Sequence, residues 1–271
     1  MATQSETMLL EPIAHATVQD ASVVHLTSSI PPRGIDATSL ERDAVRPASR
    51  LQKAAVTLQL AGVNFASSAT NGLVVVGLPR MAADLHLPAE IGFWPTSVPG
   101  LATASTLLLA GAVADVLGPK SVELVGCVAG GVAMLACGLT RRGEELVALR
   151  ALQGLGLALH LSSSVGLVTK VMPRGRERNL CFACLGLSLP LGFSLGLVLG
   201  GVLVDTIGWR AGWYLYGAIT LLLSAVGVWA LPKSAPLGSL SVVLRSLAAT
   251  VDWVGALLAS AFITLVSYFL A

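Results

Sequence analysis

Three polar side chains in one apolar segment are the first candidates for chemistry in this sequence. Arg150, Gln153 and His160 lie in the stretch LVALRALQGLGLALHLSSSVGLV, residues 146–168, which is otherwise mostly leucine, valine, alanine and glycine. At 100° per residue in a helix, the three fall with Ser164 in one stripe roughly 80° wide. In a bilayer, such a stripe must face protein or a water-filled cavity.

Arg150 and His160 each leave two interpretations open. An arginine in hydrocarbon costs at least about 2.5 kcal/mol unless it finds a partner, which favours a place in a functional cavity. Arg150 also lies near the start of the segment, from which an arginine can extend to the lipid headgroups. His160 titrates near neutral pH, so it is either a proton site or a hydrogen-bonded structural residue. No Asp or Glu is expected at mid-membrane depth, and Glu123 is placed near the inner end of its segment.

A second polar stripe precedes this one in the chain. Asn64, Ser67, Ser68 and Asn71 follow the helical spacing i, i+3, i+4 and i+7. Asparagine in lipid needs hydrogen-bond partners. The stripe therefore either lines a transport cavity, with Asn64, Ser67 and Asn71 as candidate contacts, or holds this helix to its neighbours.

The elements that position these residues are membrane-spanning helices. Of the 271 residues, 54% are hydrophobic and only 12% charged, whereas roughly a quarter are charged in ordinary soluble domains. The mean hydropathy is +0.78. We expect an all-α, polytopic membrane protein, because several windows reach the length of about 20 apolar residues that a span requires. The windows are 54–78, 94–114, 121–140, 144–166, 179–204, 210–231 and 253–270.

Basic residues predict the orientation and the organisation of the chain. Most Lys and Arg fall before the first window and in alternate connections, which places the N-terminus in the cytoplasm. The predicted parts are a disordered cytoplasmic tail (1–52), a six-helix domain (53–231), a cytoplasmic loop (232–250) and a seventh helix (251–271) that looks cut at its end. The sequence does not distinguish plasma from vacuolar membrane.

Two further motifs concern helix connections and helix packing. Gly111, Asp115, Gly118 and Lys120 lie in a very short turn, where Asp115 is expected to cap the next helix or pair with a basic neighbour. Glycines at every fourth position of the fifth window form a bare ridge that lets another helix approach closely. That ridge consists of Gly192, Gly196 and Gly200, followed by Gly201.

Enzyme chemistry finds no support in this sequence. It contains no nucleotide loop, nucleophile constellation or metal-binding cluster, and no cofactor is expected. Cys181 and Cys184 form a CxxC inside an apolar segment, where small buried hydrophobes are expected. No basic, aromatic-rich patch indicates nucleic acid.

These motifs together resemble the amino-terminal half of a major facilitator superfamily transporter. The turn resembles the family's G-x-L-A-D-R-x-G-R-K signature, with Val116 and Pro119 in place of its arginines. Residues 150–156 resemble its R-x-x-Q-G-x-G signature, and the glycine ridge resembles its antiporter signature, with Leu197 in place of the usual proline. The stretches GWRAGWYLYG and DWVGALLAS resemble the fungal 14-helix drug:proton antiporter branch.

The resemblance implies a proton-coupled exporter of small apolar or amphipathic compounds, present as an amino-terminal fragment. Arg150, Gln153 and His160 would serve coupling, and the Asp115 turn would serve as a cytoplasmic gate. Its partners would be the bilayer, a small-molecule substrate and protons, with a second half or a second copy completing the cavity. The alternatives are a non-transporting remnant or partner subunit, or a nutrient importer of the same superfamily.

Overall fold

The structure is a computed structural model that describes residues 49–232 and 253–270. The described helices belong to one compact unit, residues 47–271. Most of the predicted tail and of the predicted connecting loop lies outside the described residues. Within the described ranges every regular element is helical, which confirms the predicted fold class.

The described residues form long α-helices at the positions of the predicted windows. Six of these helices are long and apolar enough to cross a bilayer. A seventh helix, α9, coincides with the last predicted window. A short 3-10 turn, η1 (Ala89–Ile91), joins the first two helices. The α-helices are α2 (Arg50–Asp84), α3 (Trp94–Leu117), α4 (Pro119–Leu139), α5 (Gly143–Val171), α6 (Arg176–Thr206), α7 (Trp209–Ala230) and α9 (Trp253–Leu270).

Local sequence explains where two of these helices begin. Ser49 precedes α2, and its hydroxyl accepts a hydrogen bond from the backbone N–H of Gln52 at 3.1 Å, as an N-cap residue does. Pro119 occupies the first turn of α4, directly after Gly118, whose φ of 83° suits glycine. The predicted cap by Asp115 is wrong. Asp115 is exposed and still belongs to the last turn of α3, so Gly118 occupies the cap position of α4.

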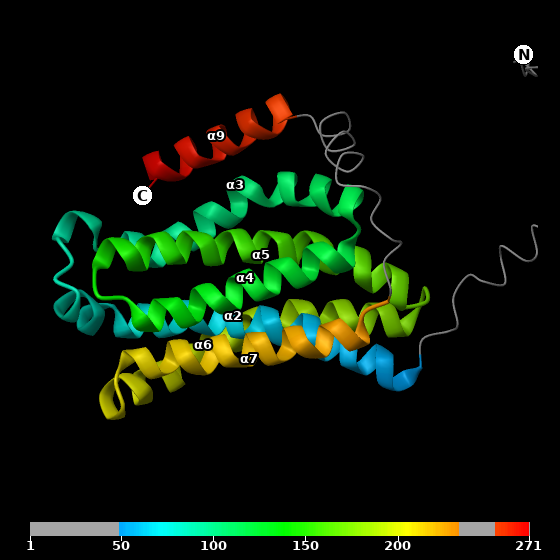
Figure 1. Cartoon of the computed structure of the whole chain (residues 1–271), viewed down its shortest axis with the longest axis horizontal. Coiled ribbons are helices and arrows are strands. Elements are labelled where there is room, and N and C mark those ends of the chain that lie inside the picture. Colours follow the sequence, from blue (N-terminus) through cyan, green and yellow to red (C-terminus); the bar gives the residue numbers. More distant parts are fainter. Residues whose placement is uncertain (1–48, 233–252, 271) are drawn as a thin grey trace, which may run out of the picture. The chain divides into compact units, whose positions relative to one another are not determined.

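Helix α2 has extensive contacts with two neighbouring helices in the described bundle. It packs along α6 and α7, while α4 packs between α5 and α7, and α3 packs on α5 (Figure 1). Helix α9 contacts α3, where the hydroxyl of Ser260 donates to the backbone carbonyl of Ser105. The helix that carries Arg150, α5, is therefore covered by α3 and α4.

The glycine ridge of α6 lies against α2. All three ridge glycines are buried, and a Cβ added at Gly196 would clash with the backbone carbonyl of Ala69. Gly201 differs, because a Cβ there would meet only Val76 Cγ1 at an ordinary 3.7 Å. The backbones approach closely at three levels: Gly192 beside Phe65, Gly196 beside Ala69 and Gly200 beside Leu73.

Two apolar clusters lie toward opposite ends of these helices. One surrounds Trp213 and Leu146, and the other surrounds Leu60 and Leu167. On α5 the buried polar residues fall between the two clusters in sequence, and on α2 Asn64, Ser67 and Ser68 do so. The fold therefore places its polar side chains in the middle of the bundle, where each needs a partner within the protein.

Candidate functional site

The guanidinium of Arg150 is fully buried and makes three hydrogen bonds. Its Nε donates to the carbonyl of Pro95 at 2.9 Å, Nη1 to Gln153 Oε1 at 2.8 Å and Nη2 to Asn71 Oδ1 at 2.7 Å. The Arg150 guanidinium carbon also lies 5.4 Å from the centre of the Trp213 ring, within cation–π range. Four helices, α2, α3, α5 and α7, thus meet at this one side chain.

These contacts contradict one of the two interpretations of Arg150, its extension to the lipid headgroups. A side chain that extended to the headgroups would be exposed and bound to solvent. Arg150 is instead 0% exposed, and its partners are protein groups. Carbonyl and amide oxygens accept hydrogen bonds from the guanidinium but carry no negative charge. A positive charge is therefore fixed in the bundle interior.

A cavity of about 300 Å³ opens next to this network. Asn71 and Gln153 line the cavity, whereas Arg150 lies behind them and holds both amides by their oxygens. The amide nitrogen of Gln153 donates to the hydroxyl of Thr70 at 2.8 Å, so this amide is held on both sides. The remaining wall is mostly apolar and comes mainly from α3 and α5: Pro99, Gly100, Ala104, Leu107, Gly154 and Leu157. Two polar residues complete it, Thr103 of α3 and Ser67 of α2.

The polar stripe of α2 contributes both to the wall of this cavity and to a contact with a neighbouring helix. Asn71 and Ser67 line the cavity, whereas the hydroxyl of Ser68 donates to the backbone carbonyl of Leu189 and so joins α2 to α6. Asn64 is buried, does not line this cavity, and its Oδ1 has no hydrogen-bond partner in the described part of the chain.

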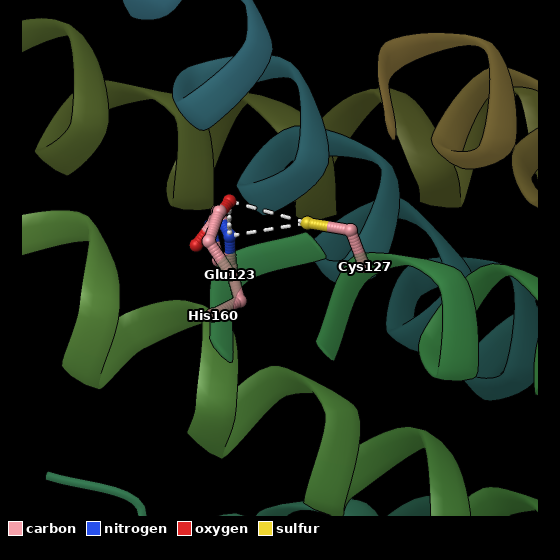
Figure 2. A group of neighbouring side chains, drawn as sticks. All are labelled: Glu123, Cys127 and His160. Atoms are coloured by element: carbon pink, nitrogen blue, oxygen red, sulfur yellow. Dashed lines mark hydrogen bonds and ion pairs between the residues drawn. The ribbon is translucent and has the colours of Figure 1, made fainter. Parts of the chain in front are cut away.

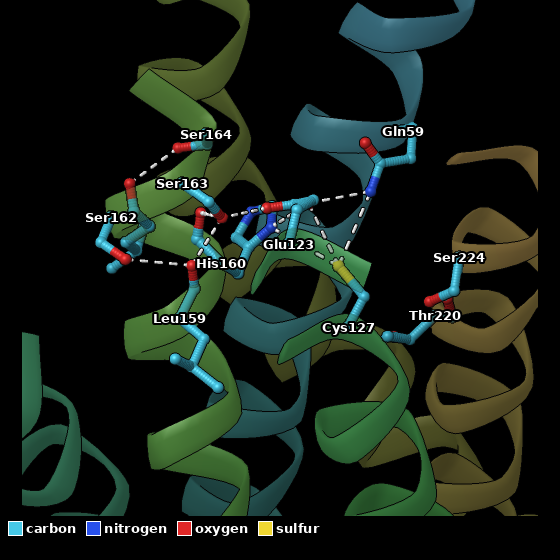
Figure 3. Close-up of polar contacts among 11 residues, drawn as sticks. Gln59, Glu123, Cys127, Leu159, His160, Ser162, Ser163, Ser164, Thr220 and Ser224 are labelled. Carbon is cyan, nitrogen blue, oxygen red and sulfur yellow. Dashed lines mark hydrogen bonds and ion pairs between the residues drawn. The ribbon is translucent and has the colours of Figure 1, made fainter. Parts of the chain in front are cut away.

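A second buried polar cluster surrounds Glu123, which the sequence analysis placed near the membrane surface. Glu123 is 0% exposed and its Oε1 lies 2.7 Å from Nδ1 of His160 (Figure 2). Gln59 Nε2 donates to the same oxygen at 2.9 Å, and Ser163 Oγ donates to Oε2 at 2.8 Å (Figure 3). Cys127 Sγ donates to Oε1 at 3.2 Å. We define these five residues as the Glu123 cluster.

The Glu123 cluster keeps its carboxylate buried, although Glu123 lies near the start of α4, as expected. It also shows His160 to be hydrogen-bonded, which both earlier interpretations of this histidine permit. His160 is 1% exposed in its side chain, and its Nε2 has no partner among the described residues. The sequence contained one usable signal, since a mid-segment histidine requires a polar neighbour and α4 carries one carboxylate.

Glu123, Cys127 and His160 each have one potential metal-ligand atom, and these three atoms lie within 4.8 Å of one another. Their spacing nevertheless suits hydrogen bonds better than a metal ion. In a tetrahedral zinc site the nitrogen and oxygen ligands stand about 3.4 Å apart, given their bond lengths to zinc. The 2.7 Å between Nδ1 and Oε1 leaves too little room for an ion between them.

Comparison with known families finds one family model that matches residues 60–271. That range matches the Major Facilitator Superfamily, and it includes the Arg150 network and the Glu123 cluster apart from Gln59. The chain belongs to this superfamily. As a superfamily member with six helices of spanning length, it is an integral, multi-pass membrane protein of a transporter family.

Three curated transporters or resistance proteins illustrate the relationship within the superfamily. The MFS-type transporter 1 of Pyricularia oryzae is 39% identical over 185 residues, which cover 68% of this chain and 30% of that protein. The puromycin resistance protein pur8 of Streptomyces alboniger is 32% identical over 165 residues, covering 60% and 32%. The methylenomycin A resistance protein of Streptomyces coelicolor is 36% identical over 111 residues, covering 41% and 23%. The chain spans about a third or less of the length of these relatives.

The turn that resembles the superfamily signature has its own geometry in this member. Lys120 donates to the carbonyls of Val228 and Leu231 at 3.1 and 2.9 Å, so it binds the C-terminal end of α7. Gly111 has open space around its Cβ position. Lys120, rather than Asp115, therefore joins the α3–α4 turn to another helix.

Proposed function

We propose that this superfamily member acts in proton-coupled export of small apolar or amphipathic compounds. The observation that carries the proposal is the 300 Å³ cavity, in which Asn71 and Gln153 are held in place by a buried arginine. Its volume falls at the lower end of small-molecule sites, and its mostly apolar wall with a few fixed polar groups is typical of them.

The roles of the residues follow from their contacts. Asn71 and Gln153 would contact the substrate, and Arg150 would position them, because it reaches both amide oxygens but does not line the cavity. His160 would take part in proton coupling through the Glu123 cluster.

The helix contacts fit the proposed movement. Gly192, Gly196 and Gly200 bring α6 against the backbone of α2, on which Asn71 lies, so a shift at this interface would move one wall of the cavity. Lys120 at the end of α7 is the contact of the proposed gating turn. In transporters built from two bundles, substrate binds between them near the midplane. The opposing wall would come from a second half or a second copy, and the N-terminus would face the cytoplasm.

Two relatives support export rather than uptake. The proteins from Streptomyces alboniger and Streptomyces coelicolor are named for resistance to puromycin and to methylenomycin A. Resistance by a membrane transporter is achieved by removing the compound from the cell. The matched segments cover 32% and 23% of these two proteins, so their names give a class of substrate and not an identity.

The test measures accumulation of ethidium, a fluorescent amphipathic probe, in cells that lack their own drug exporters. Cells that produce the protein should accumulate less ethidium, and a protonophore should remove the difference. Arg150→Ala should abolish the difference at equal membrane abundance, whereas Arg174→Ala, at an exposed loop arginine, should not. Increased accumulation would indicate an importer, and no effect in any cell would favour a non-transporting subunit.

A further inference from the structure

We propose that Glu123 and His160 form the proton-binding site of this transporter, and that a void of the size of one water molecule lies between His160 and Gln153, the hydrogen-bond partner of Arg150. The proposal rests on the proposed export function and assigns its proton to named atoms. It departs from the sequence analysis, in which His160 was the only embedded candidate.

The pair has the contacts that a proton-binding site needs. Glu123 Oε1 and His160 Nδ1 are 2.7 Å apart, so one proton can lie on either atom without any movement of the side chains. Gln59 and Ser163 donate to the two carboxylate oxygens and fix the orientation of the carboxylate. Figure 3 shows these donors converging on Glu123 from α2 and α5.

The surrounding helices add no other charge to the described environment of the pair. Helix α2 contributes the neutral Gln59, α5 contributes Ser163, and α7 contributes Thr220 and Ser224 (Figure 3). The remaining titratable group is the thiol of Cys127 on α4. Any change in the protonation of the pair is therefore a change in the local net charge.

Net charge explains how such a pair can couple to transport. With one shared proton, as carboxylate and imidazolium or as carboxylic acid and imidazole, the pair carries no net charge and can remain sealed. Loss of that proton leaves one negative charge, whose burial without water costs several kcal/mol. The sealed arrangement therefore corresponds to the proton-loaded state, and proton release requires that the site open to water.

A small void links this pair to the substrate cavity. It has a volume of about 10 Å³, and both His160 and Gln153 line it. This volume is close to the smallest that holds one water molecule. Nε2 of His160 is buried without a partner among the described residues, and a water in the void would supply one. His160 and Gln153 are seven residues apart on α5, about 10 Å along the helix, so one water and the two side chains span the distance.

When the site opens to water, a proton from solution is passed through the water in the void to Nε2 of His160, and the proton on Nδ1 moves to Oε1 of Glu123. The Nδ1···Oε1 hydrogen bond is kept throughout. Release reverses these steps. A change in the protonation of His160 can affect the cavity through Gln153, because Gln153 lines both the void and the cavity. The Gln153 amide is itself hydrogen-bonded to Arg150 and Thr70.

The first test follows histidine itself. The chain has four histidines, and nitrogen NMR of histidine-labelled protein in lipid nanodiscs assigns His160 by comparison with His160→Gln. We expect an imidazole signal with a shared proton that disappears in Glu123→Gln and persists in Glu177→Gln, a substitution at an exposed carboxylate of α6. A His160 signal that is the same in the wild type and in Glu123→Gln would overturn the proposal.

The second test separates coupling from transport in proteoliposomes loaded with ethidium. Coupling between two sites amounts to about 5–150-fold. We expect Glu123→Gln, which imitates the loaded state, to lose efflux driven by a pH gradient about tenfold or more and to retain ethidium exchange without a gradient. His160→Gln, the second variant, should behave in the same way.

The outcomes distinguish this inference from the proposed function. If the wild type shows neither exchange nor driven efflux, the export function fails and the coupling role falls with it. If the wild type is active and Glu123→Gln keeps driven efflux, or loses exchange as well, only the proton-site assignment fails. Cys127→Ala should keep coupling. A loss there equal to that of Glu123→Gln would indicate a metal site formed by all three residues and would overturn the proposal.

Discussion

The contact between α6 and α2 should be sensitive to a single added methyl group at Gly196. In Gly196→Ala the new Cβ would lie 2.7 Å from the Cα of Ala69. Non-bonded carbon atoms prefer about 3.5–4.0 Å, so the two helices would have to separate locally by close to 1 Å. Backbone atoms on a packed helix cannot move aside as a flexible side chain can.

The expected loss of stability in Gly196→Ala can be estimated from other substitutions that add atoms to well-packed protein cores. Extra methyl groups in well-packed cores cost about 1–3 kcal/mol, and the higher helix propensity of alanine returns at most about 1 kcal/mol. A chain of this size changes its melting temperature by roughly 2–4 °C per kcal/mol. We therefore expect Gly196→Ala to melt several degrees below the wild type, and to lose ethidium efflux if α6 must shift against α2.

Gly201→Ala provides the matched control, because it makes the same chemical change five residues further along the same helix. Its Cβ would meet Val76 Cγ1 at 3.7 Å, which is ordinary contact. We expect an unchanged or slightly raised melting temperature, measured by size-exclusion chromatography after heating in detergent. Equal melting of Gly196→Ala and Gly201→Ala would refute the close approach of the two helices.

Three other substitutions test separate contacts. Thr70→Val removes the acceptor of the Gln153 amide and should cost about 1–3 kcal/mol and weaken ethidium efflux, whereas unchanged efflux would show that this amide needs no anchor. Lys120→Met removes two hydrogen bonds to the end of α7 and should lower the melting temperature by a few degrees, and an unaltered melting curve would contradict that role. Asp84→Asn weakens an exposed pair with Arg210 and should change stability by less than about 1 kcal/mol, so a large loss would show that the pair is buried in the assembled protein.

Helix positions could be predicted because the bilayer constrains them strongly. Each span needs about 20 apolar residues, and the windows contained enough leucine, valine and alanine to show them. The ends were predicted less well. Helix α2 extends to Asp84 rather than 78, and α5 to Val171 rather than 166, because helical hydrogen bonding continues through polar residues beyond the apolar window.

The Arg150 network was predictable only in part. Helical spacing put Arg150 and Gln153 on one face, and they do form a hydrogen bond. Periodicity within one helix cannot show which residues of other helices reach that face. The contacts with Asn71 of α2, Pro95 of α3 and Trp213 of α7 depend on tertiary packing.

Glu123 shows that a residue near the start of its own helix can still be fully buried in the bundle. It is the fifth residue of α4, about 6 Å from the start of that helix, which suggested a place near the surface. Its neighbours extend much further in that direction: α5 continues for 11 residues beyond His160, or about 16 Å, and α2 begins nine residues before Gln59, or about 13 Å. These longer helices enclose the start of α4, so the carboxylate is sealed although its own helix has barely begun. Because burial of a lone carboxylate is so costly, the partner His160 is a requirement of this architecture, and a proton shared between the two is the simplest way to meet it.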